Sequence, residues 1–294
     1  MLNKSPLVSV IISTYNREKY LNNCLKNILK QDYHNFEVLI IDQSSNTSKK
    51  FIKYINSLKN IVRYYKASFT NLSLARNMGI KNAKGDIVVF IDDDALAEKK
   101  WLSEIVRTFK ITGAHAVGGK IDPLWQNKKP DWIKNNMLWV FSILDYADQI
   151  TDFVWPACPI GTNMAIQKDV FTKLGMFNKN ICHQGSKLLY NDEVEFINKL
   201  FINKFKIIYT PLAIVKHIIP SNKITKKYLL KRYFYQGVSD RQLANLNKSI
   251  KEDFKKSKDI FLKNLFVFII KKHTFDKMCY IMQQLGFMIG KLYI

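Results

Sequence analysis

The chain has 294 residues, of which 47% are hydrophobic, so it can bury a large core and is not intrinsically disordered. Its 46 basic and 24 acidic residues give a net charge of +22, which indicates either an anionic partner, such as a nucleic acid or a membrane surface, or simply many solvated lysines. The four cysteines form no CxxC pair, which argues against a structural zinc site and a disulfide scaffold and favours a reducing compartment.

Short apolar runs alternate with helical patterns through the first half of the chain. The expected strands cover residues 7–13, 36–42, 61–67 and 87–91. The expected helices cover residues 18–31, 47–58, 72–83 and 98–111. Strands that alternate with crossover helices predict an α/β fold, with a mostly parallel sheet flanked by helices.

Polar residues follow three of these strands at the point where each strand ends. They are Ser13-Thr14-Tyr15-Asn16, Asp42-Gln43-Ser44 and Asp92-Asp93-Asp94. Ligands of such sheets bind beyond the carboxyl ends of the strands, so we expect the three groups to meet in one crevice. The acidic triplet favours a hard cation, because clustered carboxylates repel one another and Mg²⁺ and Mn²⁺ prefer oxygen ligands. The alternative is an acidic turn that caps the following helix.

The second half of the chain is less regular. Its expected elements are helices over 168–174 and 190–201, strands over 206–211 and 214–217, and basic helical sequence from about 223 onward. Two other nucleotide-binding folds are excluded, because the sequence lacks their motifs. The turn STYNREKY (13–20) contains no glycine of a dinucleotide fingerprint, and GAHAVGGK (113–120) has the wrong spacing for a phosphate loop.

Seven segments stand in a characteristic order along the chain. They are VSVIISTYNR (8–17), LIIDQSS (39–45), LSLARNMGI (72–80), GDIVVFIDDDA (85–95), IGTNMAI (160–166), GMF (175–177) and NDEVEF (191–196). With them the chain resembles the inverting family-2 glycosyltransferases, which have the GT-A fold, over roughly residues 6–220. The resemblance implies a catalytic domain over 1–222, with a nucleotide-binding half (1–120) and an acceptor-binding half (121–222). A helical tail (223–294) follows.

The resemblance also implies which residues bind the nucleotide sugar. They are Ser13, Thr14, Tyr15, Asp42, Arg76, Asp92 and Asp93. Tyr15 would stack on the base, Asp42 would accept a hydrogen bond from the base edge, and Arg76 would pair with the diphosphate. The structural alternatives for these three residues are a packing ring, a helix cap and a surface arginine.

The remaining site residues follow from the same resemblance. Asp94 matches the metal ligand for Mn²⁺ or Mg²⁺, and His217 is a further candidate ligand. The general base falls on Glu193 or Asp192, whose order is swapped relative to the family motif; the alternative is an acidic first turn of a helix. Gly161 and Asn163 match the acceptor side.

The sequence of the tail bears on whether the chain spans or contacts a membrane. Residues 260–270 and 278–294 are apolar but too short or too interrupted to span a bilayer. Basic pairs such as Lys226-Lys227, Lys255-Lys256 and Lys271-Lys272 border them, which favours contact with an anionic membrane surface. The alternatives are packing on the catalytic domain or on a second subunit in a homo-oligomer. The QxxRW string of processive relatives is missing at Gln236, so we expect transfer of single sugars.

Together these features predict a metal-dependent inverting glycosyltransferase of the hexosyltransferase class. It would move a sugar from a nucleoside-diphosphate sugar, by resemblance most often a UDP-sugar, to a hydroxyl of a glycan or glycolipid acceptor. A lipid-linked cell-surface glycan fits best, as in polysaccharide biosynthesis. We expect a cytoplasmic protein, peripheral at the inner face of the cell membrane. No nucleic-acid partner is expected, because zinc-finger and aromatic RNA-binding signatures are missing. The alternative is a non-catalytic sugar-nucleotide-binding or scaffold protein of the same fold.

Overall fold

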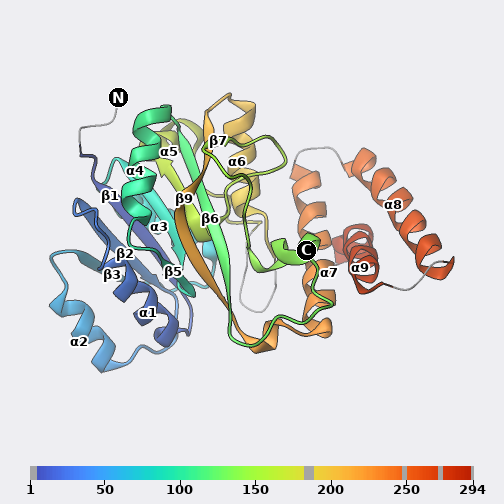
Figure 1. The fold of residues 1–294 in the computed structure, drawn as a ribbon, viewed down its shortest axis with the longest axis horizontal. Coiled ribbons are helices and arrows are strands. Elements are labelled where there is room, and N and C mark those ends of the chain that lie inside the picture. The colour runs from blue at the N-terminus through green and yellow to red at the C-terminus, as the bar shows by residue number, and fades with distance from the viewer. Residues whose placement is uncertain (1–4, 182–188, 247–249, 271–273, 293–294) are drawn as a thin grey trace. The chain divides into compact units, whose positions relative to one another are not determined.

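The computed structural model describes residues 5–181, 189–246, 250–270 and 274–292 (Figure 1). Lys271 and Lys272 of the expected basic borders lie outside these residues. The chain divides into two compact units. The first contains Met1–Leu124, Ser142–Lys179 and Glu193–Ile218, and the second contains Trp125–Phe141, Asn180–Asp192 and Ile219–Ile294.

The first unit is built on one mixed sheet with the strand order β3-β2-β1-β4-β8-β6-β9-β5, and β7 pairs with β9 beside this path. Its parallel part consists of β1 (Val8–Thr14), β2 (Phe36–Asp42), β3 (Val62–Lys66) and β4 (Ile87–Asp92). Its antiparallel part consists of β5 (Ala95–Ala97), β6 (Ala116–Trp125), β7 (Thr151–Asp152), β8 (Met164–Gln167) and β9 (Ile207–Ile219).

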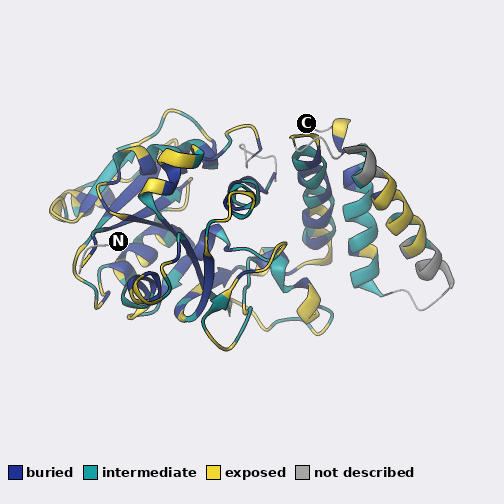
Figure 2. Ribbon diagram, turned by 90° about the horizontal axis from the view of Figure 1, so that it is seen from above, coloured by how far each residue is buried: buried dark blue, intermediate teal, exposed yellow. Residues whose placement is uncertain are grey.

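Helices cover both faces of this sheet (Figure 1). One face packs against α1 (Glu18–Ile28), α2 (Lys49–Ser57) and α4 (Trp101–Thr112). The other face packs against α3 (Leu72–Asn82), α5 (Lys168–Leu174) and α6 (Asp192–Ile202). The central strands are buried on both sides, as the dark blue sheet in Figure 2 shows. This burial explains why they read as continuous apolar runs.

The second unit consists mainly of helices. Its elements are the 3-10 helices η1 (Asn135–Phe141) and η3 (Ser221–Lys223), then α7 (Lys226–Leu246), α8 (Ile250–Ile270), α9 (Phe275–Ile289) and the final turn η4 (Gly290–Leu292). Helices α7 and α9 approach each other closely, because Gly237 faces the backbone of Gln283 and Gly286 faces the backbone of Phe234.

Side chains from the middle of the chain complete this second unit. Trp139 packs edge-on against Tyr233, with ring centroids 5.0 Å apart. The Arg232 guanidinium lies 3.4 Å from the ring centroid of Tyr190, and the Tyr190 N–H donates to Ser239 Oγ at 2.9 Å. Among the described residues we find no helix with the length and apolar character needed to cross a bilayer.

Candidate active site

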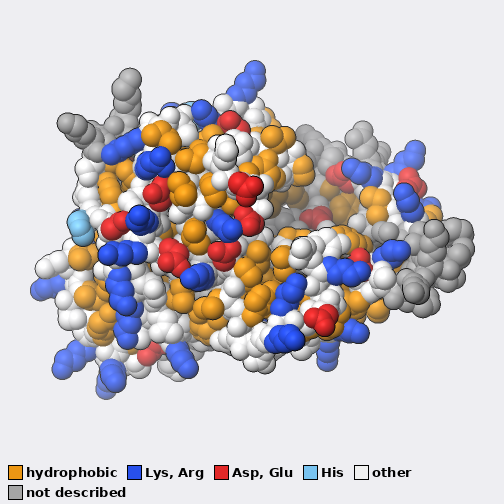
Figure 3. Space-filling view, in the orientation of Figure 1, with side chains coloured by type: hydrophobic (Ala, Val, Ile, Leu, Met, Phe, Trp, Pro, Cys, Tyr) orange, Lys and Arg blue, Asp and Glu red, His pale blue; other side chains and the backbone are white. Residues whose placement is uncertain are grey.

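The strand register brings the expected polar groups to one edge of the sheet. Thr14, the last residue of β1, pairs with Asp42 of β2, and Ser13 pairs with Asp92 of β4. The carboxyl ends of these three parallel strands therefore lie side by side. Tyr15 follows at this edge and is 44% exposed. On the face drawn in Figure 3, acidic side chains gather near the middle, whereas Lys and Arg are numerous over the part built by α1 and α2.

Asp92, Asp94 and His217 form a compact cluster at this edge. Each offers one ligand atom, and the three atoms lie within 4.8 Å of one another. His217 comes from β9, where it pairs with Ala95 directly after the acidic triplet. Its Nε2 lies 3.1 Å from Asp94 Oδ1. Thr162 donates a hydrogen bond of 2.5 Å to Asp92 and thereby orients that carboxylate.

The donor set of this cluster suits Mn²⁺ or Mg²⁺. Two carboxylates and one imidazole are the oxygen and nitrogen ligands that such cations accept. Three protein ligands also leave coordination positions for phosphate oxygens and water. The sequence analysis had assigned Asp92 to the nucleotide sugar, and the structure groups it with the two expected metal ligands.

Asp93, which follows β4, is buried. It accepts a hydrogen bond of 2.6 Å from Thr14 Oγ1, which ties β1 to β4 at the site. Burial, followed by the charge of Asp94, raises the pKa of Asp93 to about 7.

Arg17 is a site residue that the sequence analysis missed. Its Nη1 lies 3.2 Å from Asp93 Oδ1 and 2.9 Å from Asp94 Oδ2. Burial opposes its charge, but the two carboxylates outweigh that effect and raise the pKa of Arg17. The available signal was its position just beyond β1, at the same sheet edge as the acids.

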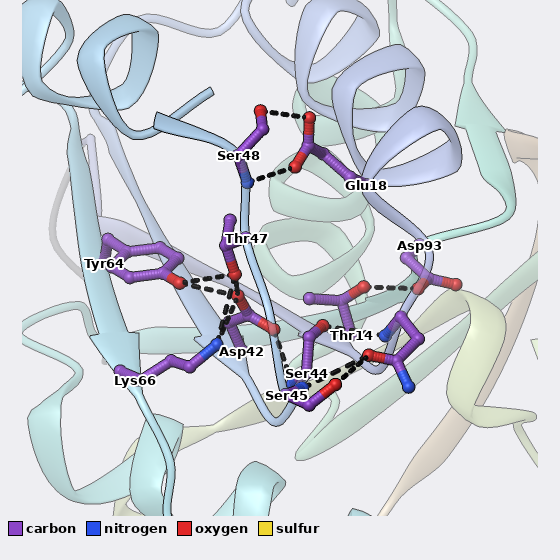
Figure 4. A network of polar contacts seen from close by, with 11 residues as sticks. Thr14, Glu18, Asp42, Ser44, Ser45, Thr47, Ser48, Tyr64, Lys66 and Asp93 are labelled. Carbon is purple, nitrogen blue, oxygen red and sulfur yellow. Dashed lines mark hydrogen bonds and ion pairs between the residues drawn. The ribbon is translucent and has the colours of Figure 1, made fainter. Parts of the chain in front are cut away.

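Asp42 is the centre of a polar network between β2 and β3 (Figure 4). Its Oδ1 accepts the Ser44 N–H at 2.7 Å, and its Oδ2 accepts the hydroxyls of Thr47 and Tyr64, each at 2.5 Å. Burial opposes ionisation, yet these hydrogen bonds hold the pKa of Asp42 below its usual value. Burial and Asp42 together raise the pKa of Tyr64 to about 12.

A pocket of about 210 Å³ opens beside this network. Its lining includes Thr14, Asn16, Glu18, Asp42 and Ser44. The expected nucleotide residues Thr14 and Asp42 thus share one pocket at the carboxyl edge.

Arg76 and Glu193 form an ion pair on the other side of the parallel strands. Arg76 Nη1 lies 2.7 Å from Glu193 Oε2, and the Gly161 N–H donates to Glu193 Oε1 at 3.3 Å. Arg76 is only 4% exposed, and its guanidinium lies 6.0 Å from the ring centroid of Phe90 and 5.5 Å from that of Phe177. The two donors fix the orientation of the Glu193 carboxylate.

A short 3-10 helix, η2 (Gly161–Asn163), connects these features. Gly161 contacts Glu193, and the next residue, Thr162, contacts Asp92. Asn163 points into the interior: its Oδ1 accepts from Trp101, and its amide donates to the carbonyls of Lys120 and Ala213. It is 1% exposed, and the resemblance assigns it to the acceptor side.

Asp192, the other candidate base, is the first residue of α6 and is buried. It belongs to the second compact unit, whereas Glu193 belongs to the first. The Glu193 carboxylate contacts Arg76 and Gly161.

The sequence and the fold match known proteins. The family model described as glycosyl transferase family 2 matches residues 9–175, and the chain belongs to this family. The glucosyl-dolichyl phosphate glucuronosyltransferase of Haloferax volcanii is 25% identical over 270 residues, which cover 88% of this chain and 83% of the relative. A relative from Methanococcus voltae is 32% identical over 140 residues, which cover 43% of each chain. It is a dolichyl N-acetyl-α-D-glucosaminyl phosphate glucuronosyltransferase whose transferred sugar is a diacetamido-dideoxy-glucuronic acid.

Solved structures agree on the fold. GalNAc-T7, crystallised with UDP, GalNAc and Mn²⁺, superposes with a TM-score of 0.61 at 16% identity and covers 85% of this chain. TarS of S. aureus superposes with a TM-score of 0.53, also at 16% identity, over 82% of this chain. The matches span 55% and 43% of those two proteins. The predicted family, fold class and enzyme class, a glycosyltransferase, are confirmed.

Proposed function

We propose that this chain is a metal-dependent, inverting glycosyltransferase that transfers a single sugar from a nucleoside-diphosphate sugar to a hydroxyl of a lipid-linked acceptor. One observation carries the proposal. Consecutive residues of η2 contact the acidic cluster and the Arg76–Glu193 pair, so a cation site and an oriented carboxylate lie on two sides of one short segment.

Asp92, Asp94 and His217 would hold the cation. When bound, Mn²⁺ or Mg²⁺ supplies Lewis-acid stabilisation of the departing nucleoside diphosphate. Ser13, Thr14, Tyr15, Asp42 and Asp93 would bind the nucleoside. The pocket beside Thr14 and Asp42 supports this assignment, and the exposed ring of Tyr15 is suited to stacking on a base.

Glu193 would act as the general base. A base must lie within hydrogen-bond reach of the attacking hydroxyl and must be held in position. The contacts of Glu193 with Arg76 and Gly161 supply that orientation and favour it over Asp192. The hydroxyl oxygen would form its bond to the anomeric carbon as the diphosphate oxygen leaves, and Glu193 would take the hydroxyl proton. In this proposal Arg76 orients the base in addition to its expected role at the diphosphate, Gly161 borders the acceptor, and Asn163 holds η2 in place.

The relatives support the choice of donor and acceptor. The names of the relatives from Haloferax volcanii and Methanococcus voltae describe transfer to dolichyl-phosphate-linked sugars, and GalNAc-T7 was crystallised with UDP, GalNAc and Mn²⁺. We therefore favour a UDP-sugar donor and a polyprenyl-phosphate-linked sugar as acceptor. Such an acceptor lies at a membrane, which suits a peripheral, cytoplasmic protein with basic helices; the same helices are candidates for contact with a second subunit.

The proposal can be tested in two steps. A thermal-shift panel of sugar nucleotides with Mn²⁺ identifies the donor, because a ligand of the folded state raises stability. Transfer to a polyprenyl-phosphate-linked sugar is then measured for Asp94→Asn and Glu193→Gln. The control is Asp169→Asn, an exposed acid paired with Lys173 on α5.

We expect Glu193→Gln to slow transfer by roughly 10²–10⁴-fold while retaining the Mn²⁺-dependent thermal shift. Asp94→Asn should lose both the shift and the transfer, and Asp169→Asn should retain both. Wild-type transfer by Asp94→Asn would contradict metal dependence through this cluster. Wild-type transfer by Glu193→Gln would move the base elsewhere.

A further inference from the structure

Arg17 lies beside the acidic cluster, by which we mean Asp92, Asp93 and Asp94. It neutralises the carboxylates of Asp93 and Asp94. A single nitrogen, Nη1, bridges Asp93 Oδ1 at 3.2 Å and Asp94 Oδ2 at 2.9 Å. The other oxygen of Asp94 lies 3.1 Å from His217 Nε2. Both oxygens of Asp94 are therefore engaged by nitrogen atoms of the protein itself.

The backbone of Arg17 is fixed, whereas its side chain can leave the cluster. Arg17 is the N-cap of α1, and its carbonyl accepts the Leu21 N–H at 3.0 Å. Its side chain is 44% exposed, compared with 5% for Asp93 and 7% for Asp94. The carboxylates are thus buried, whereas the Arg17 side chain is already partly in contact with solvent.

A divalent cation at this site would compete with Arg17 for the negative charge of the carboxylates. A cation held by Asp92, Asp94 and His217 would take the His217 nitrogen that now faces Asp94. It would also add two positive charges close to the guanidinium. Like charges repel strongly in a partly buried site, so the guanidinium would have to move away.

We propose that Arg17 is an internal counter-ion that occupies the acidic cluster in the metal-free protein and is displaced when the metal binds. This inference rests on the proposed metal-dependent function. Once displaced, the guanidinium remains anchored at the start of α1 and can pair with an anionic group of the donor. Arg17 thus weakens metal binding in the absence of donor, and the donor reverses this effect by giving the guanidinium a new partner.

The test measures Mn²⁺ binding directly, without enzyme activity. Electron paramagnetic resonance of unbound Mn²⁺ is recorded during titration of the full chain, with and without UDP. We compare the wild type with Arg17→Met, which keeps an unbranched side chain and removes the charge. The matched control is Arg107→Met, because Arg107 is 54% exposed and pairs with Glu104 on α4.

Without UDP, Arg17→Met should bind Mn²⁺ at least about tenfold more tightly than the wild type, because a repelling positive charge is removed. UDP should strengthen Mn²⁺ binding less in Arg17→Met than in the wild type, and Arg107→Met should match the wild type. Arg17→Lys keeps the charge but loses the planar guanidinium, so its affinity for Mn²⁺ should lie between those of the wild type and Arg17→Met. It also provides the comparison if Arg17→Met does not fold.

Two results would overturn the inference in distinguishable ways. If the wild type binds Mn²⁺ and both Arg17 variants bind it no more tightly, Arg17 does not compete with the metal. If no protein in the set binds Mn²⁺ with or without UDP, the metal-dependent function fails, and this inference fails with it.

Discussion

Gly161→Ala is the sharpest test of the geometry around Glu193. A Cβ at residue 161 would lie 2.9 Å from both Arg76 Cζ and Glu193 Oε2, and closer still to Arg76 Nη2. Ordinary van der Waals contact begins near 3.4 Å, so the guanidinium and the carboxylate must separate from the added methyl by about half an ångström or more. Arg76 has little room to move, because it is only 4% exposed and packs against the Phe90 and Phe177 rings.

The size of the effect follows from this displacement. Overpacking of this kind costs about 1–3 kcal/mol of stability. Misplacement of a catalytic group by 1 Å can cost on the order of 10²-fold in rate, so a shift of half an ångström or more should slow transfer by roughly 10- to 100-fold. We therefore expect a folded protein with a modestly lower melting temperature and a large loss in kcat.

The assay compares kcat and melting temperature for Gly161→Ala and Gly113→Ala. Gly113 ends α4 with φ of 66°, and no atom lies within 4 Å of a Cβ added there. Alanine at that position costs about 1 kcal/mol of backbone strain, so it should lower the melting temperature without slowing transfer. In the double variant with Glu193→Gln, Gly161→Ala should cause no further loss.

A Gly161→Ala protein that transfers sugar at the wild-type rate would refute this geometry. A double variant much slower than Glu193→Gln alone would show that Gly161 acts through a group other than Glu193.

Two further predictions concern stability. Burial opposes ionisation of Asp42, but its hydrogen bonds keep its folded pKa below the unfolded value of about 3.9. The resulting stabilisation is complete above pH 4 and is lost as the pH falls through the folded pKa. Asp42→Asn should therefore lower the melting temperature clearly at pH 7 and much less near pH 3. An equal deficit at both pH values would contradict this linkage. Gly237→Ala should destabilise the second unit by about 1–3 kcal/mol or more, because the new methyl would collide with the Gln283 carbonyl of α9. Thermal unfolding checks this against Asn245→Ala, an exposed position on the same helix, and equal melting temperatures would contradict the close approach of α7 and α9.

The parallel half of the sheet could be predicted closely from the sequence. The run 36–42 coincides with β2, and 87–91 contains all of β4 except its last residue. Strands buried on both faces leave uninterrupted apolar runs, and the helices between them show a clear 3.6-residue pattern. The order of these elements then placed the polar residues at one sheet edge.

The antiparallel half was harder to predict, because its strands break the usual pattern. β6 contains Gly118, Gly119 and Pro123, so it shows neither a continuous apolar run nor alternation. Gly119 is suited to its position, since a Cβ there would collide with the Ala213 carbonyl. The strand β9 appeared as two strands because Pro211 interrupts it, yet the structure continues from Ile207 to Ile219.

The candidate site was predicted in its residue types more than in its contacts. The acids, Arg76 and His217 were singled out from the chain, but their pairing depends on long-range register. Arg17 was missed because a single arginine after a strand resembles a solvated side chain. The pairing of Ser13 with Asp92 places the turn after β1 beside the acidic triplet, and this register is visible in the structure but not in the sequence.

The second unit is built from segments that are far apart in the sequence, and this bears on whether the C-terminal helices can be separated from the rest of the chain. This unit takes Trp125–Phe141 and Asn180–Asp192 from the middle of the chain and joins them to residues after 218. Trp139 and Tyr190, which come from those inner segments, pack on Tyr233 and Arg232 of α7. The helices are therefore interleaved with the rest of the chain and do not form a detachable module. A graft of these helices from a relative would have to carry the two inner segments with it, because side chains of those segments pack on α7.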